Sequence, residues 1–101
     1  MYMLTSAHQL FLRTFGNPRR VELLLDLLKG PKTVTQLTER SGMEQSAVSH
    51  NLQRLLRCGF VTVNPNGKER IYSVNKKTIG PLIKFMNLHI ETYCKHLCEG
   101  C

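Results

Sequence analysis

Hydrophobic residues recur every three or four positions over most of this chain, and this pattern predicts a mainly helical protein. The first helix is predicted at residues 3–15, where the apolar side chains at helical spacing are Leu4, Phe11, Leu12 and Phe15. The sequence GNP ends this helix. Asn17 and Pro18 predict the start of a second helix, because Asn caps helix starts and Pro is tolerated at the first helical position.

A short helix, a tight turn and a longer helix are predicted between about residues 33 and 58. Thr33 and Gln36 have the spacing of a capping box, in which each side chain bonds to the backbone of the other, so a helix starts there. Gly42 predicts its end, because many helices close with a left-handed glycine. The longer helix ends at Gly59, and its inward-facing residues are Val48, Leu52, Leu55 and Leu56.

After the longer helix the pattern changes to that of a β-hairpin, over about residues 60–74. The runs 60–63 and 70–74 are rich in β-branched and aromatic residues. The Asn66–Gly67 pair between them is typical of a tight hairpin turn. Lys68 and Arg70 are expected at the tip of this hairpin.

The last segment, about residues 78–98, is predicted to be helical again. Pro81 falls near its start, where proline is acceptable. Apolar residues then recur at spacings of three, four, three and four, a narrow heptad-like stripe that is typical of packing against another helix. These residues are Ile83, Met86, Ile90, Tyr93 and Leu97.

The order of these elements predicts one domain, residues 1–101, that is mainly α with a small β-hairpin. This α+β arrangement is a winged helix-turn-helix. No apolar run approaches the ~18 residues that a membrane span requires. The N-terminus lacks the basic start and apolar stretch of a signal peptide. We therefore expect a cytoplasmic protein without a membrane partner.

The charge of the chain points to a nucleic acid as partner. Fourteen Lys and Arg residues against seven Asp and Glu residues give a net charge of +7, and such a surplus in a small domain favours a polyanion. The outward face of the longer helix is small or hydrogen-bonding, so it fits a major groove and reaches base edges or phosphates. A basic hairpin tip fits a phosphate or minor groove. The predicted DNA-binding residues are Gln45, Ser46, Ser49, His50, Lys68 and Arg70.

Two runs, SAVSHNLQRLLRCGFV and GKERIYSV, resemble the ArsR/SmtB family of small homodimeric winged-helix repressors. The resemblance covers about residues 18–74. It implies a repressor that binds an inverted repeat in double-stranded DNA, with the recognition helix facing the operator and the hairpin as the wing. It also implies a homodimer built from the first and last helices. The predicted dimer residues are Leu4, Phe11, Ile83, Met86, Ile90, Tyr93 and Leu97.

The sensing sites of that family are not reproduced here. Many members carry the thiol motif Cys-Val-Cys-Asp-Leu before the recognition helix, whereas this chain has TVTQL, with Thr33 and Thr35 at the thiol positions. A second family site uses an Asp-x-His pair on the last helix, whereas this chain has Asn87 and His89. Neither site is therefore expected in its usual form.

The thiols of this chain gather instead in its last stretch, YCKHLCEGC. On an α-helix with ~100° per residue, Cys94, Cys98 and Cys101 fall within an arc of ~60°. Three thiolates so placed suit a soft pyramidal ion such as arsenite or antimonite, whereas zinc or cadmium needs a fourth ligand. No cofactor is required, and a soft metal or metalloid ion (arsenite, antimonite or cadmium) is the candidate inducer. Cys58, beside apolar residues, is expected in the core.

Other roles stay open on the sequence alone. The tail thiols also fit redox sensing, or plain packing as small apolar residues at the dimer seam. The domain also fits a regulator without an inducer, a winged-helix module that binds another protein, or a non-specific DNA coat. We do not expect an enzyme, because no nucleophile, acid partner and oxyanion donor stand out together.

Overall fold

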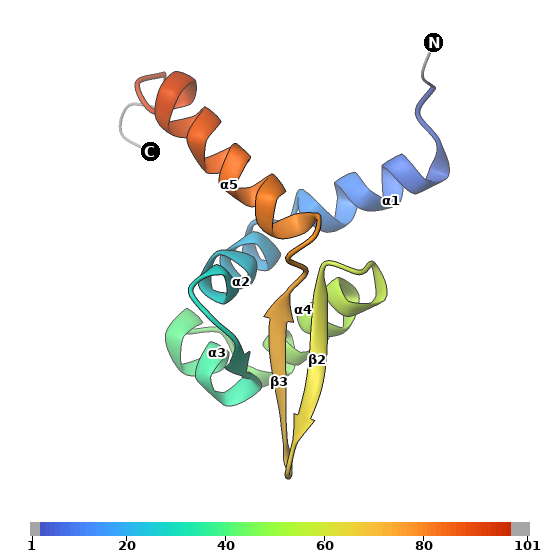
Figure 1. Cartoon of the computed structure of the whole chain (residues 1–101), viewed down its shortest axis with the longest axis vertical. Helices are drawn as coiled ribbons and strands as arrows, with labels where there is room; N and C mark the ends of the chain where they lie inside the picture. The colour runs from blue at the N-terminus through green and yellow to red at the C-terminus, as the bar shows by residue number, and fades with distance from the viewer. Residues whose placement is uncertain (1–2, 98–101) are drawn as a thin grey trace.

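The computed structural model describes residues 3–97, which form five α-helices, a π-helical turn and a three-stranded sheet (Figure 1). In chain order the elements are α1 Ser6–Phe15, α2 Pro18–Leu28, β1 Lys32–Thr33, α3 Val34–Ser41, α4 Gln45–Arg57, β2 Val61–Asn66, β3 Glu69–Val74, α5 Ile79–His89 and η1 Ile90–Cys94. The predicted fold class, mainly α with a β-hairpin in winged helix-turn-helix order, is confirmed.

Two helices extend from the body of the molecule as diverging arms (Figure 1). These arms, α1 and α5, lie on the side opposite the tip of the β2–β3 hairpin. The body is formed by α2, α3 and α4, which pack against one another and against the sheet. One end of the molecule therefore consists of two arms, and the other end consists of the helix-turn-helix and the hairpin.

An apolar core joins the helices to the sheet. Each fully buried aliphatic side chain contributes about 1.5–3 kcal/mol relative to an exposed one. From α4 the core takes Val48, Leu52 and Leu55, which are all 0% exposed. The other large buried side chains are Leu23, Leu24, Leu27, Leu37, Met43, Phe60, Val61, Tyr72, Val74, Ile79 and Ile83. One side of α4 is thus held in the core, and its other side is left for solvent or a ligand.

The helix boundaries follow the local signals in the sequence. Asn17 accepts hydrogen bonds from the backbone N–H groups of Arg19 and Arg20 and starts α2. Thr33 and Gln36 form the predicted capping box, with bonds of 3.2 and 2.9 Å. Gly42 ends α3 with a φ of 74°, a left-handed conformation that glycine adopts without strain.

One strand was missed by the sequence patterns. β1 has only two residues and pairs antiparallel with β3, with Lys32 opposite Tyr72 and Thr33 opposite Ile71. The sheet order is β1-β3-β2. Two residues are too short for an alternating pattern, so the strand depends on its contact with β3 and leaves no signal of its own.

The centre of the hairpin lies one residue later than predicted. Asn66 pairs with Glu69, so the two residues of the turn are Gly67 and Lys68 rather than Asn66 and Gly67. Gly67 has a φ of 66°, and no non-glycine residue within 3–97 has a positive φ. A positive φ at the first turn position alone is typical of a type II′ turn, which needs glycine there. Lys68 therefore occupies the tip itself.

The last helix is not α-helical as far as predicted. α5 ends at His89, and η1 follows with a π-type bond of 2.8 Å from the backbone N–H of Lys95 to the carbonyl oxygen of Ile90. A π turn is wider than an α turn, so the spacing of ~100° per residue does not apply at Cys94. The predicted common face of the three tail thiols also involves Cys98 and Cys101, which lie outside the described residues, so it stays a prediction. No helix within 3–97 is long and apolar enough to cross a membrane.

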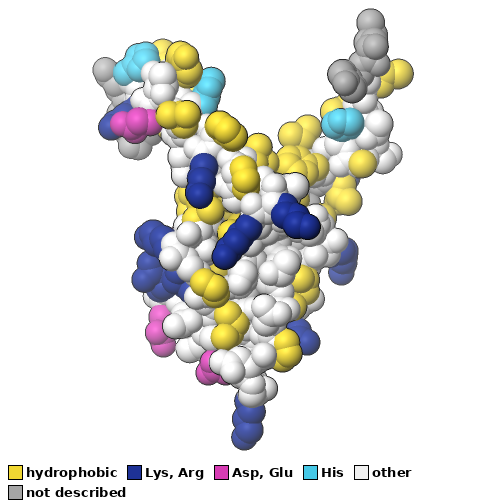
Figure 2. Space-filling model, in the orientation of Figure 1, with side chains coloured by type: hydrophobic (Ala, Val, Ile, Leu, Met, Phe, Trp, Pro, Cys, Tyr) yellow, Lys and Arg dark blue, Asp and Glu magenta, His cyan; other side chains and the backbone are white. Residues whose placement is uncertain are grey.

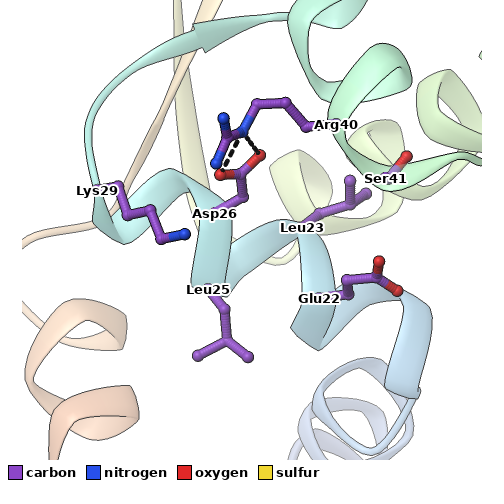
Figure 3. A pocket seen from close by; sticks show the side chains of 7 residues that line it. All are labelled: Glu22, Leu23, Leu25, Asp26, Lys29, Arg40 and Ser41. Atoms are coloured by element: carbon purple, nitrogen blue, oxygen red, sulfur yellow. Dashed lines mark hydrogen bonds and ion pairs between the residues drawn. The ribbon is translucent and has the colours of Figure 1, made fainter.

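An ion-pair cluster around Asp26 fixes α3 against α2. Arg40 donates from Nε to both carboxylate oxygens of Asp26, at 2.8 and 2.7 Å, and Lys32 Nζ lies 3.5 Å from Oδ1. Burial raises the pKa of Asp26, but the hydrogen bond from Arg40 and the charge of Lys32 outweigh it, so the pKa lies below its ordinary value. Asp26 and Glu22 are among the residues that line a pocket of about 250 Å³ (Figure 3).

Replacing this carboxylate should make stability less dependent on pH. Because the pKa of Asp26 is lowered on folding, its contribution is present at neutral pH and is lost progressively as pH falls from the ordinary Asp pKa, about 3.9, through the lower pKa of the folded chain. We expect Asp26→Asn to lower the free energy of unfolding by about 1–3 kcal/mol at pH 7, because Arg40 and Lys32 lose the carboxylate charge that both face, and by less at pH 3. Urea unfolding of parent, Asp26→Asn and the control Glu22→Gln measures this. A loss that is equal at both pH values would contradict it.

Candidate nucleic-acid interface

The polar side of α4 forms the first part of the candidate interface. With Val48, Leu52 and Leu55 in the core, this helix turns short hydrogen-bonding side chains outward. A major groove is wide enough to admit an α-helix, and small side chains let the helix approach base edges closely. The four predicted residues on this helix are accessible, Ser49 as a half-buried side chain and the others exposed: Gln45, Ser46, Ser49 and His50.

Three further side chains extend this side of α4. Gln53, Arg54 and Arg57 are exposed, and they were missing from the predicted set. Gln53 and Arg57 lie two turns beyond Ser46 and His50, at i+7, so helical periodicity could have found them. Two arginines near the end of α4 add positive charge where the helix would leave the groove.

His50 has a defined hydrogen-bonding role within α4. Arg54 Nε donates to His50 Nε2 at 3.4 Å. Since Nε2 accepts this bond, the proton of the neutral ring lies on Nδ1. In an exposed side chain, such an N–H donor is complementary to the acceptors of a purine edge, N7 or O6.

The wing supplies the second part of the interface. Lys68 and Arg70 are both exposed, and Figure 2 shows a basic side chain projecting from the end of the hairpin. Together with Thr33 and Thr35 at the start of α3, these residues line a shallow groove of about 230 Å³. The wing tip and the start of α3 thus lie side by side, at the end of the molecule opposite the arms.

The arms carry exposed apolar side chains, as the dimer prediction required, with one correction. Ile83 is 0% exposed and packs in the core of its own chain, so it is not available to a partner. Met86 is half-buried against the same core. A heptad-like stripe predicts that one side of a helix is buried, but it does not identify the surface that covers this side. In the first turns of α5, the apolar side chains pack against the body of the same chain. The other predicted dimer residues are exposed: Leu4, Phe11, Ile90, Tyr93 and Leu97.

The arms expose more apolar side chains than the predicted dimer residues alone. Figure 2 shows hydrophobic side chains gathered where the two arms diverge. A groove of about 460 Å³ opens at the base of the arms, lined mainly by Phe15, Pro18, Val21, Leu25 and Met86. The exposed side chains beyond the predicted set are Leu10, Leu12, Phe85 and Leu88.

The cysteines that the structure describes do not form a metal cluster. Cys58 and Cys94 are free and half-buried, and no group of three His, Cys, Asp or Glu residues that could hold a metal occurs within 3–97. Cys58 packs against the core, and its Sγ lies 3.4 Å from Thr14 Oγ1. Cys94 ends the π-helical turn on the arm.

The helix-turn-helix of α3 and α4, followed by the β2–β3 hairpin, makes this domain a winged helix-turn-helix. The model of the family described as bacterial regulatory protein, arsR family, matches residues 17–63. This range holds α2, α3, α4 and the start of the wing. The chain belongs to the ArsR family of bacterial transcriptional regulators, which are not enzymes, and the resemblance stated from its sequence is confirmed.

Relatives of known name agree with this assignment. The HTH-type transcriptional regulator NmtR of Mycobacterium tuberculosis is 38% identical over 80 residues, 79% of this chain and 67% of that protein. A Streptomyces lividans protein named "Probable mercury resistance operon repressor" is 34% identical over 73 residues, 72% of this chain and 58% of its own. Among solved structures, HlyU of Vibrio cholerae has a TM-score of 0.76 and 26% identity, covering 93% of this chain and 99% of that one.

Proposed function

We propose that this chain is a homodimeric repressor that binds an inverted repeat in double-stranded DNA. The observation that carries the proposal is the two-sided character of α4. One side is held in the core by residues that are 0% exposed, and the other presents Gln45, Ser46, Ser49 and His50. A helix fixed in this way can lie in a major groove without losing its packing.

In this proposal, α4 and the wing have different roles in DNA binding. Side chains of α4 read bases: Gln45 is suited to adenine, and the Nδ1–H of His50 is suited to a purine acceptor. Lys68 and Arg70 on the wing neutralise phosphates, which positions the domain on the duplex but carries little sequence information.

The proposed partner of the arms is a second copy of the chain. The last helix is apolar on more than one side, with Ile83 in its own core and Phe85, Leu88 and Ile90 exposed. Helices that are apolar on several sides are normally buried. Pairing of the arms, at the end opposite the wing, leaves both copies of α4 free. Two such helices in successive turns of the major groove read half-sites ~34–36 Å apart.

Selection from a pool of random duplexes tests the function. We expect enrichment of a short inverted repeat bound by two copies of the chain. Recovery of duplexes without a shared motif, bound with equal affinity, would favour a non-specific coat. Failure to bind duplex DNA at all would favour a protein-interaction module.

A soft metal or metalloid ion is the proposed inducer. The proposal is supported by the mercury-resistance repressor among the relatives and by the crowding of three thiols at Cys94, Cys98 and Cys101. Cys94 lies on the arm proposed to dimerise. An ion bound there would shift one arm against the other and change the spacing of the two copies of α4. Such coupling typically amounts to ~1–3 kcal/mol.

Replacing the tail thiols should abolish induced release. We expect arsenite, antimonite or cadmium to weaken operator binding by the reduced parent about 5–150-fold, and more strongly as pH rises, because thiolates are the ligands. The variant with Cys94→Ser, Cys98→Ser and Cys101→Ser should keep its DNA affinity in the presence of the ion, while the control Cys58→Ser responds like the parent. DNA release and thiolate-to-metal absorbance are followed in one titration. Equal release from the triple variant would show that the tail is no sensor.

A further inference from the structure

The recognition helix contains one buried polar side chain, Asn51. It is 9% exposed, although it lies between the exposed His50 and the core residue Leu52. Its Oδ1 accepts a hydrogen bond of 3.1 Å from Nε of Arg20 in the first turn of α2. Asn51 therefore faces the neighbouring helix and takes no direct part in the outward side of α4.

Arg20 joins three helices through this contact. While Nε binds Asn51 on α4, its Nη1 donates to the backbone carbonyl oxygen of Arg13 in the last turn of α1, at 3.4 Å. A guanidinium can make both contacts at once because its N–H groups form a rigid planar fork. The next residue of α1, Thr14, lies 3.4 Å from Cys58 at the end of α4. The last turn of α1 is thus linked to the middle of α4 through Arg20 and contacts the end of α4 directly.

This bond adds a directional constraint to the apolar packing of α4, and it acts on the rotation of the helix about its own axis. The hydrophobic effect that buries Val48, Leu52 and Leu55 is non-directional, whereas a hydrogen bond weakens when its donor and acceptor turn out of line. If α4 rotates by about 10° about its own axis, the tip of a side chain that lies about 6 Å from this axis moves by roughly 1 Å. A shift of this size is enough to break a hydrogen bond to a base.

We infer that Arg20 is a positioning residue for base reading, which holds α4 in its reading orientation through Asn51. The inference rests on the proposed function, since it assumes that α4 reads DNA. Arg20 acts through Asn51 and touches no base. Its loss should therefore lower the preference for the correct sequence more than the affinity for DNA in general.

The test uses matched pairs of variants in the full chain. Arg20→Leu removes the contact together with one charge, and Arg19→Leu removes the same charge from the exposed neighbouring side chain. Asn51→Leu removes the acceptor, and Asn51→Asp keeps one. For each variant, the affinities for the selected operator and for a scrambled duplex are measured, together with the urea unfolding midpoint.

We expect Arg20→Leu and Asn51→Leu each to lower the ratio of operator to scrambled-duplex affinity about tenfold, the loss of about one base contact. The double variant should lose no more than either single one, because both remove the same bond. Arg19→Leu and Asn51→Asp should keep the ratio within about twofold of the parent.

Two results would overturn the inference while the proposed function stands. One is an unchanged ratio in Arg20→Leu and Asn51→Leu, with the parent still preferring the operator. The other is a fall of both affinities by the same factor, in step with the fraction of chain unfolded, which would make the bond structural only. If the parent itself shows no preference between the two duplexes, the proposed function fails and the inference fails with it.

Discussion

Replacing Ile90 with Asp should convert the proposed dimer into a folded monomer. Ile90 is 44% exposed in the isolated chain, so the new carboxylate stays hydrated in the monomer. In the proposed dimer it would be buried without a partner, which costs several kcal/mol. Each 1.4 kcal/mol is tenfold in the dissociation constant, so we expect association to weaken at least 100-fold. Operator affinity should fall with it, because only one α4 remains in each complex.

Sedimentation of both chains at the same concentration checks this prediction. The control Ile90→Leu keeps the apolar volume and should remain a dimer. Circular dichroism and urea unfolding establish that the Asp variant is folded, as expected from an exposed position. A dimer that survives Ile90→Asp with unchanged affinity would remove α5 from the interface.

His50→Ala and Lys68→Ala should weaken DNA binding in different ways. His50→Ala removes a donor that we propose faces a base edge, so it should lower discrimination at one base pair by about 1–3 kcal/mol and leave the salt dependence unchanged. Lys68→Ala removes one proposed phosphate contact, so it should weaken binding to all sequences similarly. It should also reduce the slope of log K against log salt by about 0.9.

Affinity measured over a salt series, on the selected operator and on its single-base variants, separates the two effects. Lys84→Ala is the matched control, because it removes an equal exposed charge from α5, on an arm opposite the wing. It should change neither quantity. If Lys68→Ala changes the preferred bases and leaves the salt slope alone, the wing reads sequence and its proposed role is wrong.

Elements with local signals could be predicted from the sequence. Asn17 before Pro18, the Thr33–Gln36 capping box and Gly42 act within one helical turn, and the structure confirms all three. The outward side of α4 could be predicted for the same reason, because a period of 3.6 residues assigns sides without knowledge of the rest of the fold.

Features that depend on contacts between distant segments could not be predicted. β1 forms only because β3 lies beside it. Ile83 is buried because the first turns of α5 pack against the body of the chain, and a stripe of apolar residues does not predict this packing. The bond between Arg20 and Asn51 joins residues 31 positions apart, and neither residue type indicates the other. The π-helical turn at Ile90–Cys94 lacked a clear signal as well, although β-branched residues such as Ile90 and Thr92 favour the α-helix less.

Footprinting of the parent chain on a selected duplex tests the central claim most directly. If two copies of α4 read one inverted repeat, hydroxyl-radical cleavage should show two protected patches on one face of the duplex. Their centres should lie about one helical turn apart, ~34–36 Å. Uniform protection along the duplex would contradict the account. So would a single protected patch that does not grow when more of the chain is added.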